Sequence, residues 1–163
     1  MSAQTTYRFG TPMGAAGGIV DLAPYAIDTF LNEEETGNMD FGVAVVKGTA
    51  PNMIKKAAAG ATAAKIVGVT TNNRTTEYDL EGEVYLRKNK AIGVMRYGRI
   101  YVRVVPETTI AIDDPAYVST AAETAGMFTN SSSGTVAIKG RFLSTVDATT
   151  GVAMVELFNQ AQA

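Results

Sequence analysis

The sequence predicts an all-β fold, a small barrel or sandwich of short, mostly antiparallel strands, preceded by an extended N-terminal arm. Two observations predict it. Short runs of β-branched, aromatic and other apolar residues recur along the chain, and residues typical of turns separate these runs. The composition, with 46% hydrophobic and 18% charged residues among 163, is that of a globular protein. This length suits one domain plus an arm.

The first 38 residues differ from the rest of the chain. They are rich in glycine, alanine and proline, and their apolar residues follow no steady period. Pro12, Pro24 and the Gly17-Gly18 pair interrupt any helix or long strand. Disordered tails usually contain fewer apolar and aromatic residues than this segment does. We therefore interpret residues 1–38 as an arm that packs on its own domain, on a neighbouring subunit or on a partner.

Residues 39–163 are predicted to form a β-rich domain. Its first strand is FGVAVVKG, in which Phe41, Val43 and Val45 alternate onto one face. AKIVGVT is a second, short apolar strand. The alanines of the intervening NMIKKAAAGATAA favour a helix, but Gly60 and the short length predict a loop or one irregular turn.

The rest of the domain follows the same pattern. Residues 83–105 predict three strands, EVYLR, AIGVMRY and RIYVRVV, which are separated at an Asn-Lys pair and at Gly98. A turn at the Asp-Asp-Pro sequence 113–115 precedes another short strand, and the loop SSSG separates two more. RFLSTV and VAMVELF predict a closing hairpin around DATTG.

The stretch VMRYGRIYVRVV has two different faces. Strand alternation gives a core face of Ile100, Val102 and Val104. It gives an opposite face that carries Arg99, Tyr101 and Arg103. Aromatic and basic residues on an open face are typical of sheets that stack RNA bases. However, the chain is acidic, with a net charge of −2, and a second such strand is not evident. Contacts to solvent or to a protein neighbour are therefore favoured over nucleic acid.

The residue types on which most enzyme mechanisms depend are missing. The chain has no cysteine, histidine or tryptophan, which excludes disulfides, thiolate zinc sites and nucleophiles activated by histidine. The glutamates of NEEETG are consecutive, whereas calcium loops space their ligands at alternate positions. The segment GAAGGI lacks the lysine of a phosphate-binding loop. We therefore predict no catalytic, metal-binding or cofactor-binding residues, no cofactor and no enzymatic activity.

One catalytic alternative stays open at this stage. A hydrolase that depends on paired carboxylates requires Asp or Glu residues to converge in space, which a sequence does not show. Asp113 and Asp114 are more typical of a turn before proline than of such a site.

No stretch of the sequence approaches the roughly 18 consecutive apolar residues of a membrane span. The first ten residues lack the basic segment and apolar core of a secretory signal. We therefore expect a protein that is made in the cytosol and has no membrane partner.

The order of these segments resembles the structural cement, or head decoration, proteins of tailed bacteriophages. In those proteins an FG.AVV.G strand precedes a VGV strand, followed by V.R.GRI.V.V, DP.YV, a G.F hairpin and a closing G.A.VEL strand. The same series runs here through FGVAVVKG, KIVGVTTNN, GVMRYGRIYVRV, IDDPAYV, GMF and GVAMVEL, from about Gly10 to Leu157. The chain departs from it in the longer connection LRKNKAIG and at IDD, where a Gly-Asp pair is usual.

The resemblance implies a non-enzymatic virion protein, made in the host cytoplasm, that binds the outer capsid surface. Such proteins clamp neighbouring subunits of the major capsid protein together. They commonly act as homo-oligomers, so we expect a homo-oligomer, with a trimer favoured over a dimer. The residues expected to contact the capsid or a neighbouring subunit are Tyr7, Phe9, Ile19, Val20, Tyr25 and Phe30 in the arm, and Arg96, Arg99, Tyr101 and Arg103 in the strand pair.

Two expectations complete the sequence-based hypothesis. Removing residues 1–30 should weaken capsid or subunit binding and leave a folded β domain. The alternative function is an oligonucleotide-binding type of β-barrel module that binds single-stranded nucleic acid.

Overall fold

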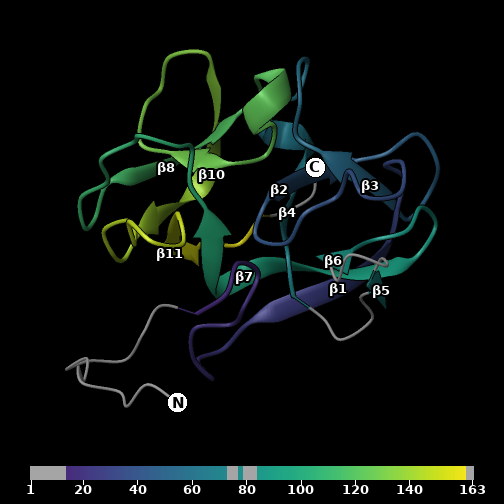
Figure 1. Cartoon of the computed structure of the whole chain (residues 1–163), viewed down its shortest axis with the longest axis horizontal. Coiled ribbons are helices and arrows are strands. Elements are labelled where there is room, and N and C mark those ends of the chain that lie inside the picture. Colours follow the sequence, from purple (N-terminus) through teal and green to yellow (C-terminus); the bar gives the residue numbers. More distant parts are fainter. Residues whose placement is uncertain (1–13, 73–76, 79–83, 161–163) are drawn as a thin grey trace, which may run out of the picture.

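The computed structural model describes residues 14–72, 77–78 and 84–160, most of which belong to strands or to the turns between them (Figure 1). The strands are β1 (Ala26–Asn32), β2 (Ala44–Lys47), β3 (Met53–Lys56), β4 (Ile66–Thr70), β5 (Glu77–Tyr78), β6 (Val84–Tyr85), β7 (Ala91–Arg103), β8 (Pro115–Ser119), β9 (Phe128–Thr129), β10 (Thr135–Phe142) and β11 (Val152–Leu157). Two 3-10 turns, η1 (Ala63–Lys65) and η2 (Ala122–Thr124), are the helical elements of the described chain. The all-β prediction is confirmed.

One half of the main sheet closes into a small barrel. Its strand order is β1-β3-β2-β4-β7, and β1 also pairs with β7, which completes the ring. The pairing of β1 with β3 is parallel, and the other pairings in the ring are antiparallel. Closure gives every barrel strand a hydrogen-bonded neighbour on both sides.

The barrel interior is filled by one hydrophobic cluster. Its buried members are Met39, Val43, Val45, Ile54, Val67, Leu86, Ile92 and Val94. Phe41 packs against the same cluster, so the predicted face of Phe41, Val43 and Val45 is confirmed. The opposite face of β2, with Ala44 and Val46, is also buried because it belongs to a second cluster outside the barrel.

The second half of the sheet continues from β7 in the order β11-β10-β8-β9, with antiparallel pairing throughout. A bridge between Val104 and Phe128 ties β9 back to the chain just beyond β7. The larger core cluster lies between this half and the outer face of the barrel, and it includes the fully buried Phe128 and Phe142. The predicted closing hairpin is confirmed as β10 and β11, joined by a turn at residues 147–151.

The strand β7 is common to both halves, and the predicted break at Gly98 is wrong. β7 is one strand of 13 residues. Residues 91–97 pair with β1 and β4, and residues 98–103 pair with β11. Gly98 has a φ of +127°, and a Cβ atom placed on it would lie 2.7 Å from the Cβ of Tyr25. The glycine therefore marks a change of partner strands within a continuous strand, where its sequence signal suggested a turn.

Replacing Gly98 by alanine is expected to lower the free energy of unfolding by about 3 kcal/mol, since the positive φ and the contact with Tyr25 both oppose a side chain. Gly134→Ala is the matched control, because Gly134 also has a positive φ but a Cβ placed on it would have no atom within 4 Å. The control should lose only about 1 kcal/mol. Urea denaturation measures the free energy of unfolding of both variants. Equal losses in the two would contradict the packing role of Gly98.

A second correction concerns residues 52–64, which were expected to form a loop or turn. Met53–Lys56 form β3, which pairs with β2 and with β1. Asn52 has a positive φ of 63° and supplies the tight turn into this strand. The strand was missed because only Ile54 of its four residues is buried and two lysines follow it.

The described part of the predicted arm packs on its own domain. Residues 26–32 of that segment are β1, a wall of the barrel. Asn32 at the end of β1 is fully buried, where its amide donates to the carbonyl of Arg87 at 3.1 Å and its Oδ1 accepts from the backbone of Glu34 at 2.9 Å. Tyr7 and Phe9 lie outside the described residues.

Candidate functional site

The segment from Gly14 to Tyr25 lies along the second half of β7. The Gly17 amide donates to the carbonyl of Tyr101 at 2.7 Å, and the Tyr101 amide donates to Gly18 at 2.9 Å. The Val20 amide donates to the carbonyl of Arg99 at 3.0 Å, and Ile19 forms a bridge with Ile100. These backbone bonds pair the N-terminal segment with the edge of β7 opposite to β11, almost as an additional strand would.

The face of β7 that carries Arg99, Tyr101 and Arg103 is therefore partly covered by the chain itself. The Tyr101 ring lies so close to Gly14 that a side chain on Gly14 would clash with it. Arg103 donates from Nε to the carbonyl of Phe41 at 3.2 Å. The predicted core face of Ile100, Val102 and Val104 is confirmed. On the opposite face, Arg99 and Tyr101 contact the N-terminal segment, whereas Arg103 contacts the loop before β2.

Arg99 is the centre of a chain of ion pairs. Its NH1 lies 2.8 Å from Asp21 Oδ2, and its Nε lies 3.2 Å from Glu156 Oε1. Glu156 also pairs with Arg141 at 3.0 Å, and Arg141 pairs with Asp113 at 3.0 Å. The network joins the N-terminal segment, β7, β11, β10 and the turn before β8.

The network changes the pKa values of its members. The hydrogen bond from Arg99 lowers the pKa of Asp21 below 3.8, with help from the amide of Ala23. Burial raises the pKa of Glu156, but hydrogen bonds from Arg141 and Arg99 outweigh it and hold that pKa below 4.5. Both groups have a lower pKa when folded, so their contribution to stability is present above pH 4.5. It is lost as the pH falls through the lowered folded values.

Asp21→Asn is expected to loosen the N-terminal segment on β7 with little effect on the rest of the fold, since its ion pair with Arg99 is lost while the backbone hydrogen bonds remain. The readout is the hydrogen-exchange protection of the Val20 amide. In the natural protein this protection should be constant above pH 4.5 and should fall below pH 3.8. Asp113→Asn, at the far end of the network, is the control and should leave Val20 protected. Unchanged protection in Asp21→Asn would contradict the role of this ion pair.

Two other predicted contact residues lie on the barrel side. Arg96 of β7 has its Nε 2.6 Å from Asp28 of β1, close enough for an ion pair although the atoms are not aligned as a hydrogen bond. Phe30 of β1 is half-buried and packs against the barrel cluster. Both residues therefore help to attach β1 to the barrel.

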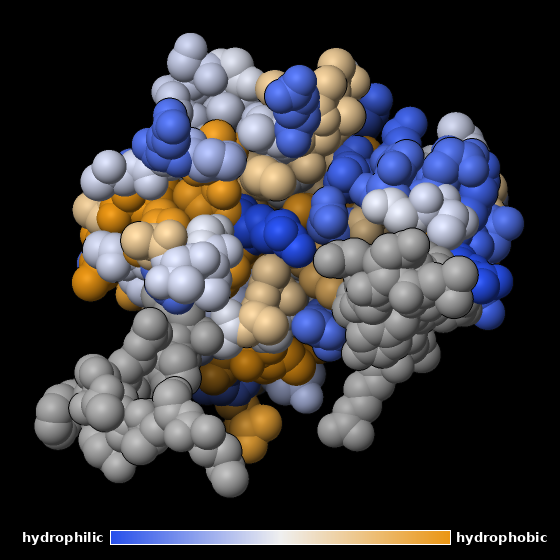
Figure 2. All heavy atoms as spheres, in the orientation of Figure 1, coloured by the Kyte–Doolittle hydropathy of each residue, from blue (hydrophilic) through white to orange (hydrophobic). Residues whose placement is uncertain are grey.

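Large apolar side chains are exposed where the N-terminal segment crosses the junction of the two halves. Leu22 is 94% exposed, and Tyr25, Tyr97 and Phe158 are each exposed by 42–47%. Tyr97 and Phe158 line a hollow of about 230 Å³ with Ala23 and Pro24, and Tyr25 lies over Gly98 in its wall. We call Leu22, Tyr25, Tyr97 and Phe158 the apolar ridge. Figure 2 shows hydrophobic atoms at the lower edge of the molecule, over the loop that precedes β1.

Sequence reasoning selected only Tyr25 of the apolar ridge, together with the neighbouring Ile19, which is 40% exposed. It missed Leu22 of the same segment, and also Tyr97 and Phe158, which come from β7 and from the residue after β11. A signal was available in the sequence. Tyr97 and Phe158 each stand next to a strand residue that faces the core, so alternation predicts that the aromatic side chain points outward. That Tyr97 and Phe158 lie close together in space depends on the pairing of β7 with β11.

Other kinds of site were also sought in the described part of the chain. Among those residues no group of three or more Asp or Glu side chains could hold a metal ion. No helix in the described ranges is long and apolar enough to cross a membrane.

The comparisons with known proteins agree with this architecture. Residues 3–158 match the family described as "Structural cement protein (E217 gp24/Pam3 gp6)". No curated protein matches the chain. A chain of "The capsid of Myoviridae Phage XM1" has a similar fold, with a TM-score of 0.70 at 20% identity, covering 96% of this chain and 98% of that one. The chain belongs to the phage structural cement protein family, and its role is a structural one in the capsid.

Proposed function

We propose that this protein binds the outer surface of a phage head and clamps neighbouring subunits of the major capsid protein together. The observation that supports this most directly is the apolar ridge. Leu22 directly precedes the Ala23 and Pro24 that line the hollow with Tyr97 and Phe158, and such a set of exposed large apolar side chains is typical of an interaction surface. Protein interfaces are enriched in such aromatic and apolar anchors.

The surroundings of the ridge also suit an interface. Arg99 and Glu156 line the same hollow as Tyr97 and Phe158, and both are engaged in the ion-pair network. A polar margin of this kind excludes water from the centre of a contact. In this proposal Ile19, Tyr25 and the ridge meet the partner directly. Val20, Arg96, Arg99, Tyr101, Arg103 and Phe30 hold the segment and β1 in position.

The proposal includes a homo-oligomer, with a trimer favoured over a dimer, on the outside of the virion after synthesis in the host cytoplasm. A symmetric oligomer presents several copies of the ridge to a repeating lattice. Weak individual contacts then combine into strong overall binding because the copies are held at high effective concentration.

Co-sedimentation with tailed-phage capsids that were assembled without the protein tests the function. We expect saturable binding and capsids that resist heating better once decorated. Light scattering of the free protein gives its mass and thus the oligomer. Absence of binding to every mature capsid that presents the matching lattice would refute the proposal.

No observation favours the nucleic-acid alternative. Arg99 is engaged by two carboxylates and Arg103 by a backbone carbonyl, so the face proposed for base stacking is occupied. A titration with labelled single-stranded DNA at low salt tests this alternative, because phosphate contacts strengthen as salt falls.

A further inference from the structure

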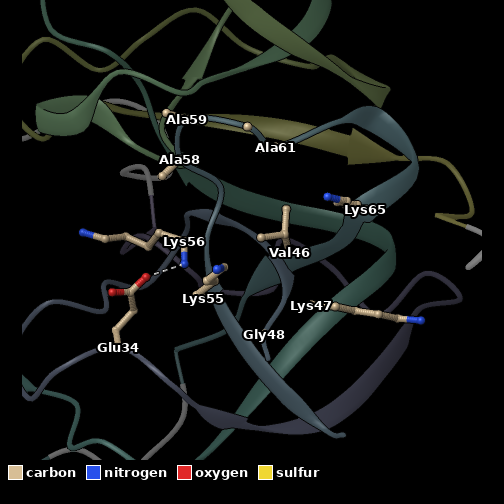
Figure 3. Close-up of a pocket in the computed structure, with 11 residues that line it drawn as sticks. Glu34, Val46, Lys47, Gly48, Lys55, Lys56, Ala58, Ala59, Ala61 and Lys65 are labelled. Carbon is tan, nitrogen blue, oxygen red and sulfur yellow. Dashed lines mark hydrogen bonds between the residues drawn. The ribbon is translucent and has the colours of Figure 1, made fainter. Parts of the chain in front are cut away.

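A second hollow, surrounded by lysines, lies on the barrel half of the molecule. It has a volume of about 500 Å³, and its walls come from β2, β3 and the loop that leads to η1. Lys47, Lys55, Lys56 and Lys65 line it, with Glu34 as the one acidic residue of the lining. Figure 3 shows Lys55 and Lys65 beside Val46, while Lys47 and Lys56 extend outward on either side.

The nearby carboxylates already have partners. The backbone amide of Lys56 donates to Glu34 at 2.9 Å, and the Lys56 ammonium pairs with Asp40 at 3.3 Å. Glu33 accepts from Thr49, which is the main cause of its lowered pKa, with a smaller contribution from the charge of Lys55. Among the described residues no carboxylate forms a direct ion pair with Lys47, Lys55 or Lys65.

This local excess of positive charge contrasts with the chain as a whole, which has a net charge of −2. Four of its 14 basic residues meet at one hollow. Because three of those ammonium groups have no ion-pair partner in the described structure, the hollow suits an anionic group that approaches from outside.

The lining decides between kinds of anion. It contains no arginine to grip a phosphate with two parallel bonds and no aromatic residue on which a base could stack. The lining also contains small aliphatic residues, Val46, Ala58 and Ala61. A carboxylate side chain, with its alkyl stem on the alanines and its oxygens among the lysines, matches this combination.

We propose that this lysine-lined hollow is a docking site for an acidic polypeptide segment of the capsid subunit, in which an aliphatic residue accompanies the carboxylates. The inference rests on the proposed capsid-binding function, which it extends by naming the chemistry of a second contact. The ridge would supply apolar contact, and the lysine hollow would supply a contact that weakens with salt.

The test uses the full-length protein and a fluorescein-labelled peptide of ten residues, eight glutamates with two central leucines. Fluorescence anisotropy at low ionic strength should show binding that weakens as salt is added. The double variant Lys55→Gln/Lys65→Gln should bind the peptide about tenfold more weakly, as expected for the loss of two exposed charge contacts. Lys90→Gln/Lys139→Gln removes the same charge from exposed positions elsewhere and should bind as the natural protein does.

Three results of the peptide assay would overturn the proposal. They are no binding of the peptide, equal weakening by both double variants, and tighter binding of a labelled dT oligomer than of the peptide. The peptide assay does not require capsids, so it separates this inference from the proposed function. If the protein binds capsids equally well with and without Lys55→Gln/Lys65→Gln, capsid binding stands and the lysine site is refuted.

Discussion

Deletion of residues 1–30 is expected to abolish cooperative folding of the protein. The deletion removes five of the seven residues of β1, Ala26 to Phe30, and with them most of the residues through which β1 pairs with β7. Backbone groups of β7 from Ile92 to Tyr97 would lose their partners in β1, and the barrel cluster would lose the cover of Phe30. A typical domain is stable by only roughly 5–15 kcal/mol, so the combined loss of this pairing and burial is expected to remove the cooperative transition.

This expectation replaces the one drawn from the sequence, which left a folded domain after the same deletion. Circular dichroism during urea denaturation is the measurement. Deletion of residues 1–13 is the control, because it removes no residue that the structure describes, and it should retain a cooperative transition. A truncated protein lacking residues 1–30 that still unfolds in one sharp transition would show that the barrel does not depend on β1.

The double substitution Leu22→Ser/Phe158→Ser is expected to weaken capsid binding about 100-fold. Apolar anchors of protein interfaces typically contribute more than about 1 kcal/mol each, and about 1.4 kcal/mol is a tenfold change in affinity, so the loss of two corresponds to about 100-fold. The free energy of unfolding should change by about 1 kcal/mol or less, because Leu22 is 94% and Phe158 45% exposed in the free chain. Co-sedimentation with capsids and urea denaturation measure the two effects separately.

Ile112→Ser supplies a matched control for this experiment. Ile112 is a large apolar residue that is 63% exposed, but it belongs to the turn before β8 and not to the apolar ridge. Its substitution should leave capsid binding unchanged. If Ile112→Ser weakens binding as much as the ridge variant does, the turn before β8 shares the contact and the ridge is not its centre.

Local patterns were sufficient to predict the strands that have one clear core face. The alternation of Ile100, Val102 and Val104 gave the correct faces of β7, because side chains of successive strand residues must point in opposite directions. The Asp-Pro turn before β8 and the hairpin of β10 and β11 were found from turn residues in the same way. In these cases the determining contacts lie within a few residues of each other.

Predictions failed where the decisive neighbour is far away in the sequence. β3 has a single buried residue, and its place depends on pairing with β1 and β2. Gly98 resembles a turn residue, yet it lies within a continuous strand because Tyr25 covers it from another segment. Residues 26–32 lack a steady apolar period, since Asp28 among them forms an ion pair with Arg96 of the neighbouring strand β7.

The same division applies to the candidate site. Composition alone excluded sites that depend on histidine or cysteine. The order of motifs predicted the family to which the chain belongs. The ridge and the lysine hollow each combine residues from separate strands and loops. The sequence by itself determined which residues can face a core and which chemistry is absent, because these properties are local. Only the tertiary structure decided which exposed side chains meet, because strand pairing over long separations sets those distances.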